Sequence, residues 1–341
     1  MHETPLVSFG LVTDVQYADV EDGWDFHRTA QRYYRNALPQ LEAAIAEWLR
    51  VAATREKSTV TRLRFAVNLG DLIDGKNRLA QTSRKALDTV HAAWTPFERA
   101  IGPVHHVVGN HELYNFAASV IHEELRVPSP VTSSHGRQAR YYDFQVPEAR
   151  QVRFIVLDCY GVSVLGRDER DPVYHQALAL LRRVNRNTNL NSPAGLVGLD
   201  RRFVAFNGAV DREQMQWLEA TLERATEKRE HVVLFTHIPL HPSTIPAPSS
   251  LVWNYDEVLA LLHRFPCVRA VFSGHAHADG YVQAPDGHGV HYVVCDAMLE
   301  CTPSETAHAL VHVFHDKIVV QGYGKIPTRE LEFPVENALQ E

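Results

Sequence analysis

The sequence predicts an α/β fold, and three observations support this class. Glycine-led turns that carry metal-binding types of side chain follow short β-branched, apolar runs at 65–67, 104–108 and 270–272. Stripes of apolar residues at helical spacing separate the early runs, which gives repeated strand–helix–strand units. Three strand-like runs lie close together near the C-terminus, a spacing typical of antiparallel pairing. The polar turns therefore fall where open α/β sheets collect their ligands, at the carboxyl ends of strands.

The N-terminal part begins with an apolar run at 6–13 that predicts a buried strand ending at Asp14. The acidic and aromatic stretch 19–29 is irregular, so we expect a loop over the strand ends, where binding groups are common. From residue 34 the apolar positions recur at steps of three and four, which predicts a helix against the sheet. Further strands at 64–69 and 104–108, with a helix between them, lead to Asp71 and to Asn110.

The second half contains a short helix at 117–126 and a hairpin or second sheet at 140–146 and 152–158. Residues 161–209 break the pattern, and we expect an insertion that sets specificity beside the site. A capping box then predicts a helix at 211–225. Later features are a strand at 231–235, a Pro-rich loop at 239–248 that rims the pocket, a helix ending near 265, and strands at 289–295, 309–315 and 317–323. No repeat or linker is present, so residues 1–341 are predicted to form a single domain.

Composition narrows the possible partners. The chain has 341 residues, is 45% hydrophobic and carries a formal net charge of -7, so it offers no basic field for a polynucleotide. Four cysteines without a C-x-x-C pair favour a reducing compartment. No basic and apolar leader or 18-residue apolar window is seen, so we expect a cytoplasmic protein with no membrane contact. We expect a monomer that acts on small molecules.

Eight polar residues at the strand ends form the candidate site. They are Asp14, Gln16, Asp71, Asn110, His111, His237, His275 and His277. Oxygen and imidazole ligands without thiolates suit a pair of divalent ions such as Mn, Fe, Zn or Mg better than a structural zinc site. Two such ions, roughly 3.5–4 Å apart, clamp a phosphoryl group for in-line attack. The residues therefore indicate hydrolysis of a phosphoester or phosphoanhydride.

The order of these blocks resembles the calcineurin-like metallophosphoesterases, which carry D-x-H, G-D-x-x-D, G-N-H-[DE], a lone His and G-H-x-H. Here the blocks read 14–16, 70–74, 109–112, His237 and 274–277. The resemblance implies two mixed β-sheets packed face to face with flanking helices, a four-layer sandwich. It implies that one metal is bound by Asp14, Gln16, Asp71 and His277, and the other by Asp71, Asn110, His237 and His275. Asp71 would bridge the metals, and His111 would be catalytic and face the scissile phosphate.

Gln16 departs from the family pattern because most members carry His there. An amide oxygen is harder than imidazole, so the exchange favours Mn over Zn. Together with the stretches 14–19, 22–26, 32–35, 70–75, 206–208 and 253–255, it makes the chain similar to the manganese-dependent ADP-ribose/CDP-alcohol diphosphatases. That resemblance implies cleavage of a nucleoside diphosphate derivative into a nucleoside monophosphate and a phosphorylated alcohol.

Several further residues have two interpretations each. Phe26 either stacks on a base or ribose or fills its own loop, and Asn207 is a candidate polar contact to the substrate. Trp253 and Tyr255 are candidate substrate contacts or core anchors. Asp74 either orients a ligand from the next layer of residues or caps the helix after Gly75. The acid of the third block, at position 112, has no assigned role beyond favouring the helix that follows it.

Two rival functions remain open at this stage. The first is a cyclic-nucleotide phosphodiesterase or phosphomonoesterase, because loops select the substrate on a shared scaffold. The second is a binding scaffold without catalysis, as some members of the superfamily have lost their metal ligands. Only the exchange at Gln16 departs from the ligand pattern here.

Overall fold

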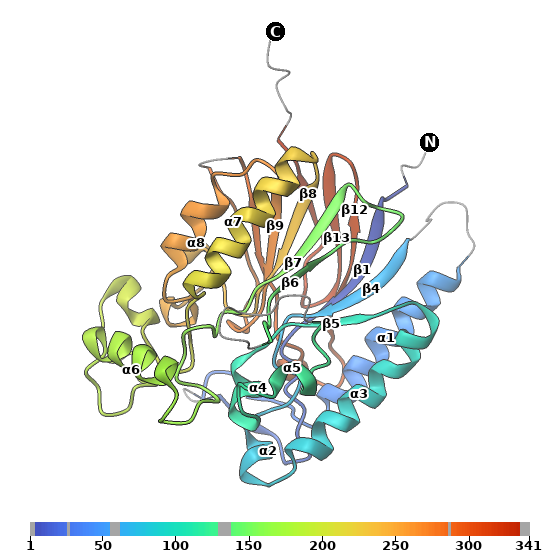
Figure 1. Ribbon diagram of the computed structural model, residues 1–341. Helices are drawn as coiled ribbons and strands as arrows, with labels where there is room; N and C mark the ends of the chain where they lie inside the picture. Colours follow the sequence, from blue (N-terminus) through green and yellow to red (C-terminus); the bar gives the residue numbers. More distant parts are fainter. Residues whose placement is uncertain (1–3, 26–27, 55–61, 129–137, 286–287, 335–341) are drawn as a thin grey trace.

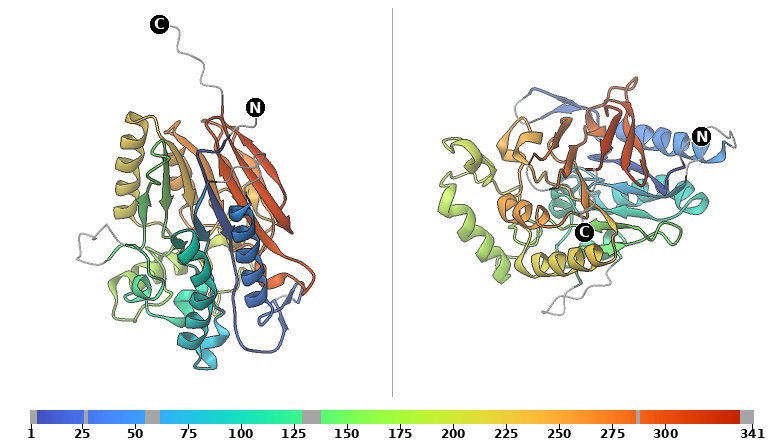
Figure 2. Two further views of the ribbon diagram at one scale, coloured as in Figure 1. Left: turned by 90° about the vertical axis from the view of Figure 1, so that its right-hand side faces the viewer. Right: turned by 90° about the horizontal axis from the view of Figure 1, so that it is seen from above.

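Two six-stranded sheets packed face to face form the centre of the molecule, and helices cover both outer faces (Figure 1). The computed structural model describes residues 4–25, 28–54, 62–128, 138–285 and 288–334. This arrangement of helix, sheet, sheet and helix layers confirms the predicted α/β sandwich. Both ends of the described chain lie at the edge of the sandwich opposite the short helix α2 (Lys76–Leu79) (Figures 1 and 2).

The first sheet joins parallel N-terminal strands to an antiparallel C-terminal meander. Its central strand, β1, pairs in parallel with β4 and in antiparallel fashion with β12. The order is β14 (Arg329–Glu332), β13 (Lys317–Gly324), β12 (Ala307–Val313), β1 (Val7–Val12), β4 (Leu63–Asn68) and β5 (Val104–His106).

The second sheet has four parallel strands between two antiparallel edge strands. Its order is β10 (Gly280–Gln283), β11 (His291–Val294), β9 (Val268–Ser273), β8 (His231–Phe235), β7 (Val152–Val156) and β6 (Tyr142–Phe144). The short strands β10 and β14 were not predicted. Each has four residues, too few for an alternating pattern to stand out.

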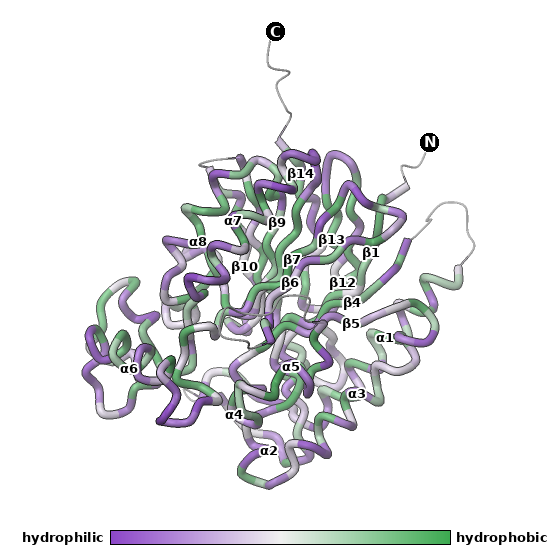
Figure 3. Tube along the Cα trace, in the orientation of Figure 1, coloured by the Kyte–Doolittle hydropathy of each residue, from purple (hydrophilic) through white to green (hydrophobic). Residues whose placement is uncertain are grey.

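The core between the sheets is aromatic. Phe9 stacks on Phe65 with ring centroids 5.1 Å apart and meets Phe235 of the other sheet edge-on at 5.4 Å. On the outer face of the first sheet, Trp48 of α1 lies over Gly10, where a Cβ atom would collide with the indole. Figure 3 shows that the central strands are hydrophobic along most of their length. This packing fixes the strand ends of both sheets against each other.

The helices follow the predicted pattern with shifted ends: the helix predicted at 211–225 spans Arg212–Glu227, and the one predicted at 117–126 is only Ile121–Glu124. Helices α1 and α3 cover the first sheet, and α7 and α8 lie beside the second (Figure 1). Part of the predicted loop at 19–29 forms the small ribbon of β2 (Gly23–Trp24) and β3 (Gln31–Arg32). None of the described helices is long and apolar enough to cross a membrane. The helices are α1 (Ala37–Ala53), α2 (Lys76–Leu79), α3 (Ser83–Ala100), α4 (Asn110–Asn115), α5 (Ile121–Glu124), α6 (Pro172–Val184), α7 (Arg212–Glu227) and α8 (Tyr255–Leu262), with 3-10 turns at Gly198–Arg202, Pro242–Thr244, Pro248–Ser250 and Met298–Glu300.

Candidate metal centre

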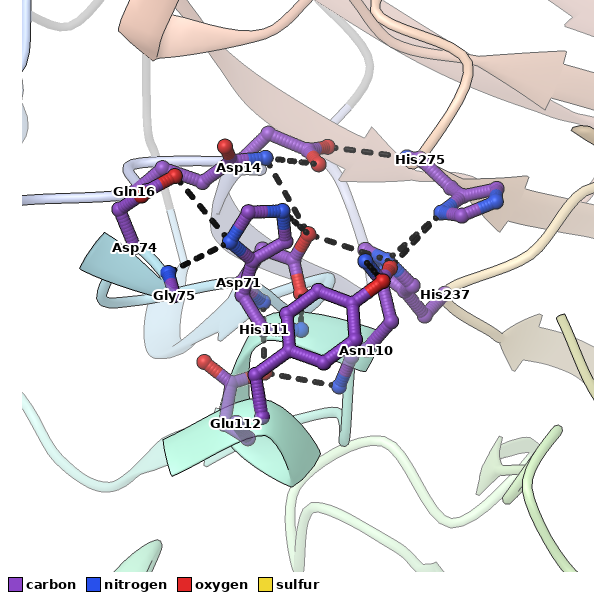
Figure 4. A network of polar contacts seen from close by, with 12 residues as sticks. Asp14, Gln16, Asp71, Asp74, Gly75, Asn110, His111, Glu112, His237 and His275 are labelled. Carbon is purple, nitrogen blue, oxygen red and sulfur yellow. Dashed lines mark hydrogen bonds and ion pairs between the residues drawn. The ribbon is translucent and has the colours of Figure 1, made fainter. Parts of the chain in front are cut away.

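The seven predicted metal ligands converge from both sheets at the carboxyl ends of parallel strands. Figure 4 labels all of them except His277. Two follow β1, one follows β4, one follows β5, one follows β8 and two follow β9. In that order they are Asp14 and Gln16, Asp71, Asn110, His237, and His275 and His277. The face-to-face packing of the two sheets is therefore what assembles the site.

The backbone at these turns is strained. Nine residues other than glycine have positive φ within the described chain, and five of them are predicted ligands. These five are Asp14, Gln16, Asp71, His275 and His277, with φ between 44° and 64°. Residues with a side chain avoid this region unless the surrounding structure enforces it, and such strain clusters at functional sites. The turns are thus shaped to aim side chains and not for local stability.

Two glycines allow the turns to approach each other closely. A Cβ atom at Gly109 would overlap the carboxylate and amide nitrogen of Asp71, and one at Gly274 would overlap Thr13 and the carboxylate of Asp14. Any larger residue would push these two carboxylates away. The glycines of the sequence blocks therefore serve the spacing of the centre.

One half of the centre surrounds the imidazole of His237. Its Nε2 atom lies 3.4 Å from Oδ2 of Asp71 and 3.1 Å from Oδ1 of Asn110. The Nδ1 atom of His275 lies 3.0 Å from the same amide oxygen. Ligand-type atoms of Asp14, Asp71 and His237 all fall within 4.8 Å of one another.

The other half surrounds Gln16 and His277. The Nε2 atom of His277 is 3.2 Å from Oδ1 of Asp14. The amide nitrogen of Gln16 lies 3.2 Å from Oδ2 of Asp71, so the Asp71 carboxylate touches both halves. The amide oxygen of Gln16 is buried and has no hydrogen-bond partner among the residues that the structure describes. This geometry matches the bridging position that the family resemblance implied for Asp71.

Each histidine of the centre is oriented by an acceptor on its outer nitrogen. Nδ1 of His237 is 2.8 Å from the carbonyl oxygen of Leu69, and Nδ1 of His277 is 2.8 Å from Oε1 of Glu300. Nε2 of His275 is 2.9 Å from Oδ1 of Asn207. An N–H donated outward leaves the inner nitrogen facing the centre, as in metal-binding histidines. Sequence reasoning missed this role of Glu300, which belongs to no family block, and misread Asn207.

The electrostatics of the centre require positive charge. Burial alone would lower the pKa of His277 and of His237, but the carboxylates of Asp14 and Asp71 raise these pKa values to about 10 and about 9. Burial raises the pKa of Asp14, yet the charges of His277 and His237 hold it well below its usual range. A cation held beside these carboxylates would supply the positive charge that the protonated imidazoles otherwise provide, and its binding would release protons.

The predicted catalytic residue, His111, lies beside the centre on α4. Its Nδ1 atom accepts the N–H of Gly75 at 2.9 Å and lies 3.1 Å from Oδ2 of Asp74. Its Nε2 atom is 3.9 Å from Oδ2 of Asp71. Burial lowers the pKa of His111, and the Asp71 and Asp74 carboxylates outweigh that effect and raise it. Oδ1 of Asp74 also accepts the N–H of Lys76 at the start of α2, so this carboxylate contacts both His111 and the helix that follows.

Glu112, left without a role by the sequence, ties two of the turns together. Its carboxylate accepts the backbone N–H groups of Asp71 at 2.8 Å, Leu72 at 2.6 Å and Gly109 at 2.8 Å. Burial and the Asp71 charge raise the pKa of Glu112 to about 7, and the N–H donors oppose that rise. This fully buried side chain therefore fixes the distance between the second and third blocks.

A cavity of about 780 Å³ opens over the centre. Besides ligands and His111, its walls contain residues from three further segments: Asp25 and residues 29–32, part of the predicted insertion at 161–209, and the end of the Pro-rich segment at 247–250. The large volume can accept an extended organic molecule. Substrate specificity would arise from these three segments.

The predicted substrate contacts need correction. Trp253 is 1% exposed and its Nε1 donates to the carbonyl of Val204, because it anchors α6 and the insertion to the body of the protein. Tyr255 lies under the guanidinium of Arg202 and does not line the cavity. Asn207 is fully buried, and its amide nitrogen is taken by backbone carbonyls, so it holds His275 instead. Phe26 lies outside the described residues.

The donor set fits a pair of divalent cations. It consists of carboxylate, amide and imidazole groups, with one carboxylate shared, an orphaned amide oxygen and inward-facing imidazole nitrogens. This mixture of hard oxygen and borderline nitrogen donors suits Mn and related ions. All seven predicted ligands are present and brought together, so the centre shows no loss of ligands.

Comparison with known proteins agrees with this geometry. A family profile described as "Calcineurin-like phosphoesterase" matches residues 8–279, and the chain belongs to this family. A protein of Oryza sativa subsp. japonica named manganese-dependent ADP-ribose/CDP-alcohol diphosphatase is 38% identical over 96% of this chain and 95% of its own. The human protein of the same name is 38% identical over 98% of this chain and 94% of its own. The crystal structure of a dimetal phosphatase from Danio rerio superposes with a TM-score of 0.85, at 35% identity over 97% of this chain and 100% of that one.

Proposed function

We propose that this protein hydrolyses the diphosphate bond of nucleoside diphosphate derivatives such as ADP-ribose and CDP-alcohols, with Mn as the preferred metal. The observation that carries this proposal is the assembled two-metal donor set with Gln16 in place of a histidine. Full-length similarity to relatives named for this activity supports it. The products would be a nucleoside monophosphate and a phosphorylated alcohol.

The residues divide the chemistry among them. When bound, two divalent cations activate water and stabilise the charge that develops on the attacked phosphate. Asp14, Gln16 and His277 would hold one ion, and Asn110, His237 and His275 the other, with Asp71 between them. The three histidines keep their orientation because Leu69, Asn207 and Glu300 accept their outer N–H groups.

His111 would act on the substrate without binding metal. Its Nδ1 is held by the Gly75 amide and by Asp74, so Nε2 is the atom free to face a phosphate oxygen or the leaving oxygen in the cavity. A leaving phosphate is a weaker base than an alkoxide. We therefore propose that His111 stabilises charge as much as it donates a proton.

Release of AMP or CMP tests the proposal directly. Purified protein is supplied with Mn or Mg and with ADP-ribose, CDP-choline or cyclic AMP, and products are separated by chromatography. We expect turnover of the two diphosphates with Mn far above that of cyclic AMP. A higher rate with cyclic AMP would indicate a cyclic-nucleotide phosphodiesterase, and no bound or activating metal would indicate a binding scaffold, with Asp71→Asn as the control in both cases.

Three wider assignments are also proposals. The segment 161–209 supplies cavity residues from a single-domain chain, which supports its role as a specificity insertion. The four described cysteines are free and buried, which supports a reducing, cytoplasmic location. We also propose that the protein acts as a monomer on small nucleotides without polynucleotide or membrane partners, in keeping with its net charge of -7.

A further inference from the structure

One cation in the cavity wall has no role in the metal centre. Arg32, on the small ribbon strand β3, lines the same cavity as His111, His275 and His277. Its side chain is 23% exposed, so it lies largely within the wall. Glu300, which orients His277, lines the cavity beside Arg32, so the guanidinium lies close to the metal centre.

The Nε atom of Arg32 is buried and has no hydrogen-bond partner within the described part of the chain. Its ion pair with Glu300 is long, because Nε lies 4.0 Å from Oε1. That oxygen already accepts the N–H of His277 at 2.8 Å. A buried guanidinium N–H without an acceptor is costly unless something else meets it.

Arg35 shows what an ordinary arginine in this segment does. Its guanidinium bonds Asp19 at 2.8 Å and Glu21 at 2.5 Å, its side chain is 51% exposed, and it does not line the cavity. The two arginines are three positions apart in the sequence. The chain therefore neutralises Arg35 at the surface and leaves the Nε atom of Arg32 without an acceptor among the described residues.

A diphosphate presents a charge that the metal centre alone would not cover. When bound, the cations would stabilise charge on the phosphate under attack, and the second phosphate would lie on the other side of the bridging oxygen. When water attacks, a new P–O bond forms, the bond to the bridging oxygen breaks, and the electron pair of that bond stays on the second phosphate. A planar guanidinium matches phosphate oxygens in charge and in the spacing of its donors.

We propose that Arg32 binds the second phosphate of the substrate and so selects diphosphates over substrates with one phosphate. This proposal rests on the proposed function, because it assumes a diphosphate in the cavity. Arg201, the other arginine in the cavity wall, is exposed and comes from the opposite loop, so it is the rival for this role.

The test compares one substrate with two phosphates and one with a single phosphate. kcat/KM is measured with Mn for ADP-ribose and for bis(p-nitrophenyl) phosphate, using the parent protein and the variants Arg32→Ala, Arg32→Lys, Arg35→Ala and Arg201→Ala. We expect Arg32→Ala to lower kcat/KM for ADP-ribose by about 10–100-fold, because charged hydrogen bonds to the second phosphate are lost. The kcat/KM for the phosphodiester should change less than about threefold. Arg32→Lys should recover part of the loss, and Arg35→Ala should behave as the parent.

A binding measurement keeps this inference separate from the proposed function. Calorimetric titration of the Mn-loaded proteins with α,β-methylene-ADP and with AMP requires no turnover. We expect Arg32→Ala to weaken the binding of the diphosphate analogue about tenfold or more, and the binding of AMP much less. Equal losses for both ligands and both substrates would overturn the proposal, as would a selective loss in Arg201→Ala alone. If the parent protein binds the analogue but does not cleave ADP-ribose, the proposed function fails while the role of Arg32 stands.

Discussion

At the scale of single residues, we expect the identity of position 16 to influence which metal the centre prefers. The Gln16 amide contacts Asp14, Asp71 and His277, and its oxygen lacks a partner. Most family members have an imidazole there, which is a softer donor than an amide. One side chain can therefore tune the centre without altering its geometry.

Replacement of Gln16 by His should move metal preference from Mn toward Zn. The variant keeps a neutral donor but exchanges oxygen for nitrogen, and zinc gains more from that change than manganese does. Calorimetry gives the affinities for Mn and Zn of the parent and of the variant, and from them the Mn-to-Zn affinity ratio of each protein. An unchanged Mn-to-Zn ratio would show that position 16 does not tune the metal.

Glu300 supports the centre from outside the ligand set. Glu300→Gln keeps an oxygen that can accept the His277 N–H but removes the charge that raises the ring's basicity. We expect Mn affinity to fall by roughly 10–100-fold, a range common for such outer partners. Glu305→Gln, exposed and five residues away, is the matched control. Equal Mn affinities in both variants, measured by calorimetry, would contradict this role.

At the scale of elements, the site depends on turns that are fastened to each other. Glu112 sits in the first turn of α4 and receives N–H groups from its own turn and from the turn after β4. The short helix α4 thus works as a clamp between two strands of the first sheet. Asn110 and His111 both lie on this helix, so it positions the predicted ligand and the predicted catalytic side chain together.

Removing the Glu112 carboxylate should loosen this clamp. Glu112→Ala leaves three buried N–H groups without acceptors, so we expect the free energy of unfolding to fall by at least about 3 kcal/mol. Urea unfolding measures the change, with Glu123→Ala on α5, where the side chain is 76% exposed, as control. A loss no larger than in the control would mean that water replaces the carboxylate. The loss of unfolding free energy in Glu112→Gln should lie between the losses in Glu112→Ala and in the control Glu123→Ala.

At the scale of the whole molecule, contact between the sheets sets both stability and site. His105 of β5 stacks on Phe144 of β6 with centroids 3.7 Å apart, and its Nδ1 meets the Tyr142 hydroxyl at 2.9 Å. Burial lowers the pKa of His105 to about 3. The imidazole is therefore neutral in the folded protein at all but acidic pH.

This histidine should make the fold sensitive to acid. The unfolded chain binds a proton near pH 6.5 while the folded chain does not, so stability falls as pH drops from about 6.5 toward 3. The double variant His105→Phe with Tyr142→Phe removes both polar groups, and we expect it to lose less stability between pH 7 and pH 5. Urea unfolding at the two pH values measures this difference. The same loss in parent and double variant would place the acid sensitivity elsewhere, and exposed His315→Gln serves as control.

Sequence alone determined the chemistry of this protein. Side chains such as Asp14, Asn110 and His237 follow apolar runs directly, so their type and their place at strand ends are local properties that a linear pattern preserves. The same holds for α1 and α7, whose apolar stripes have helical spacing. Family membership followed from the order of these blocks.

Only the tertiary structure decided which residues support the centre and which line the cavity. Glu300, Asn207 and Glu112 act across 23, 68 and 41 residues of chain, and no local pattern encodes such hydrogen bonds. Trp253 and Tyr255 were candidates for substrate contacts or core anchors, and packing against the insertion buried Trp253 while Tyr255 came to lie under Arg202. An aromatic or amide side chain has the same chemistry in a cavity wall or in the protein core. Its burial alone determines whether it can contact a substrate or only support the fold.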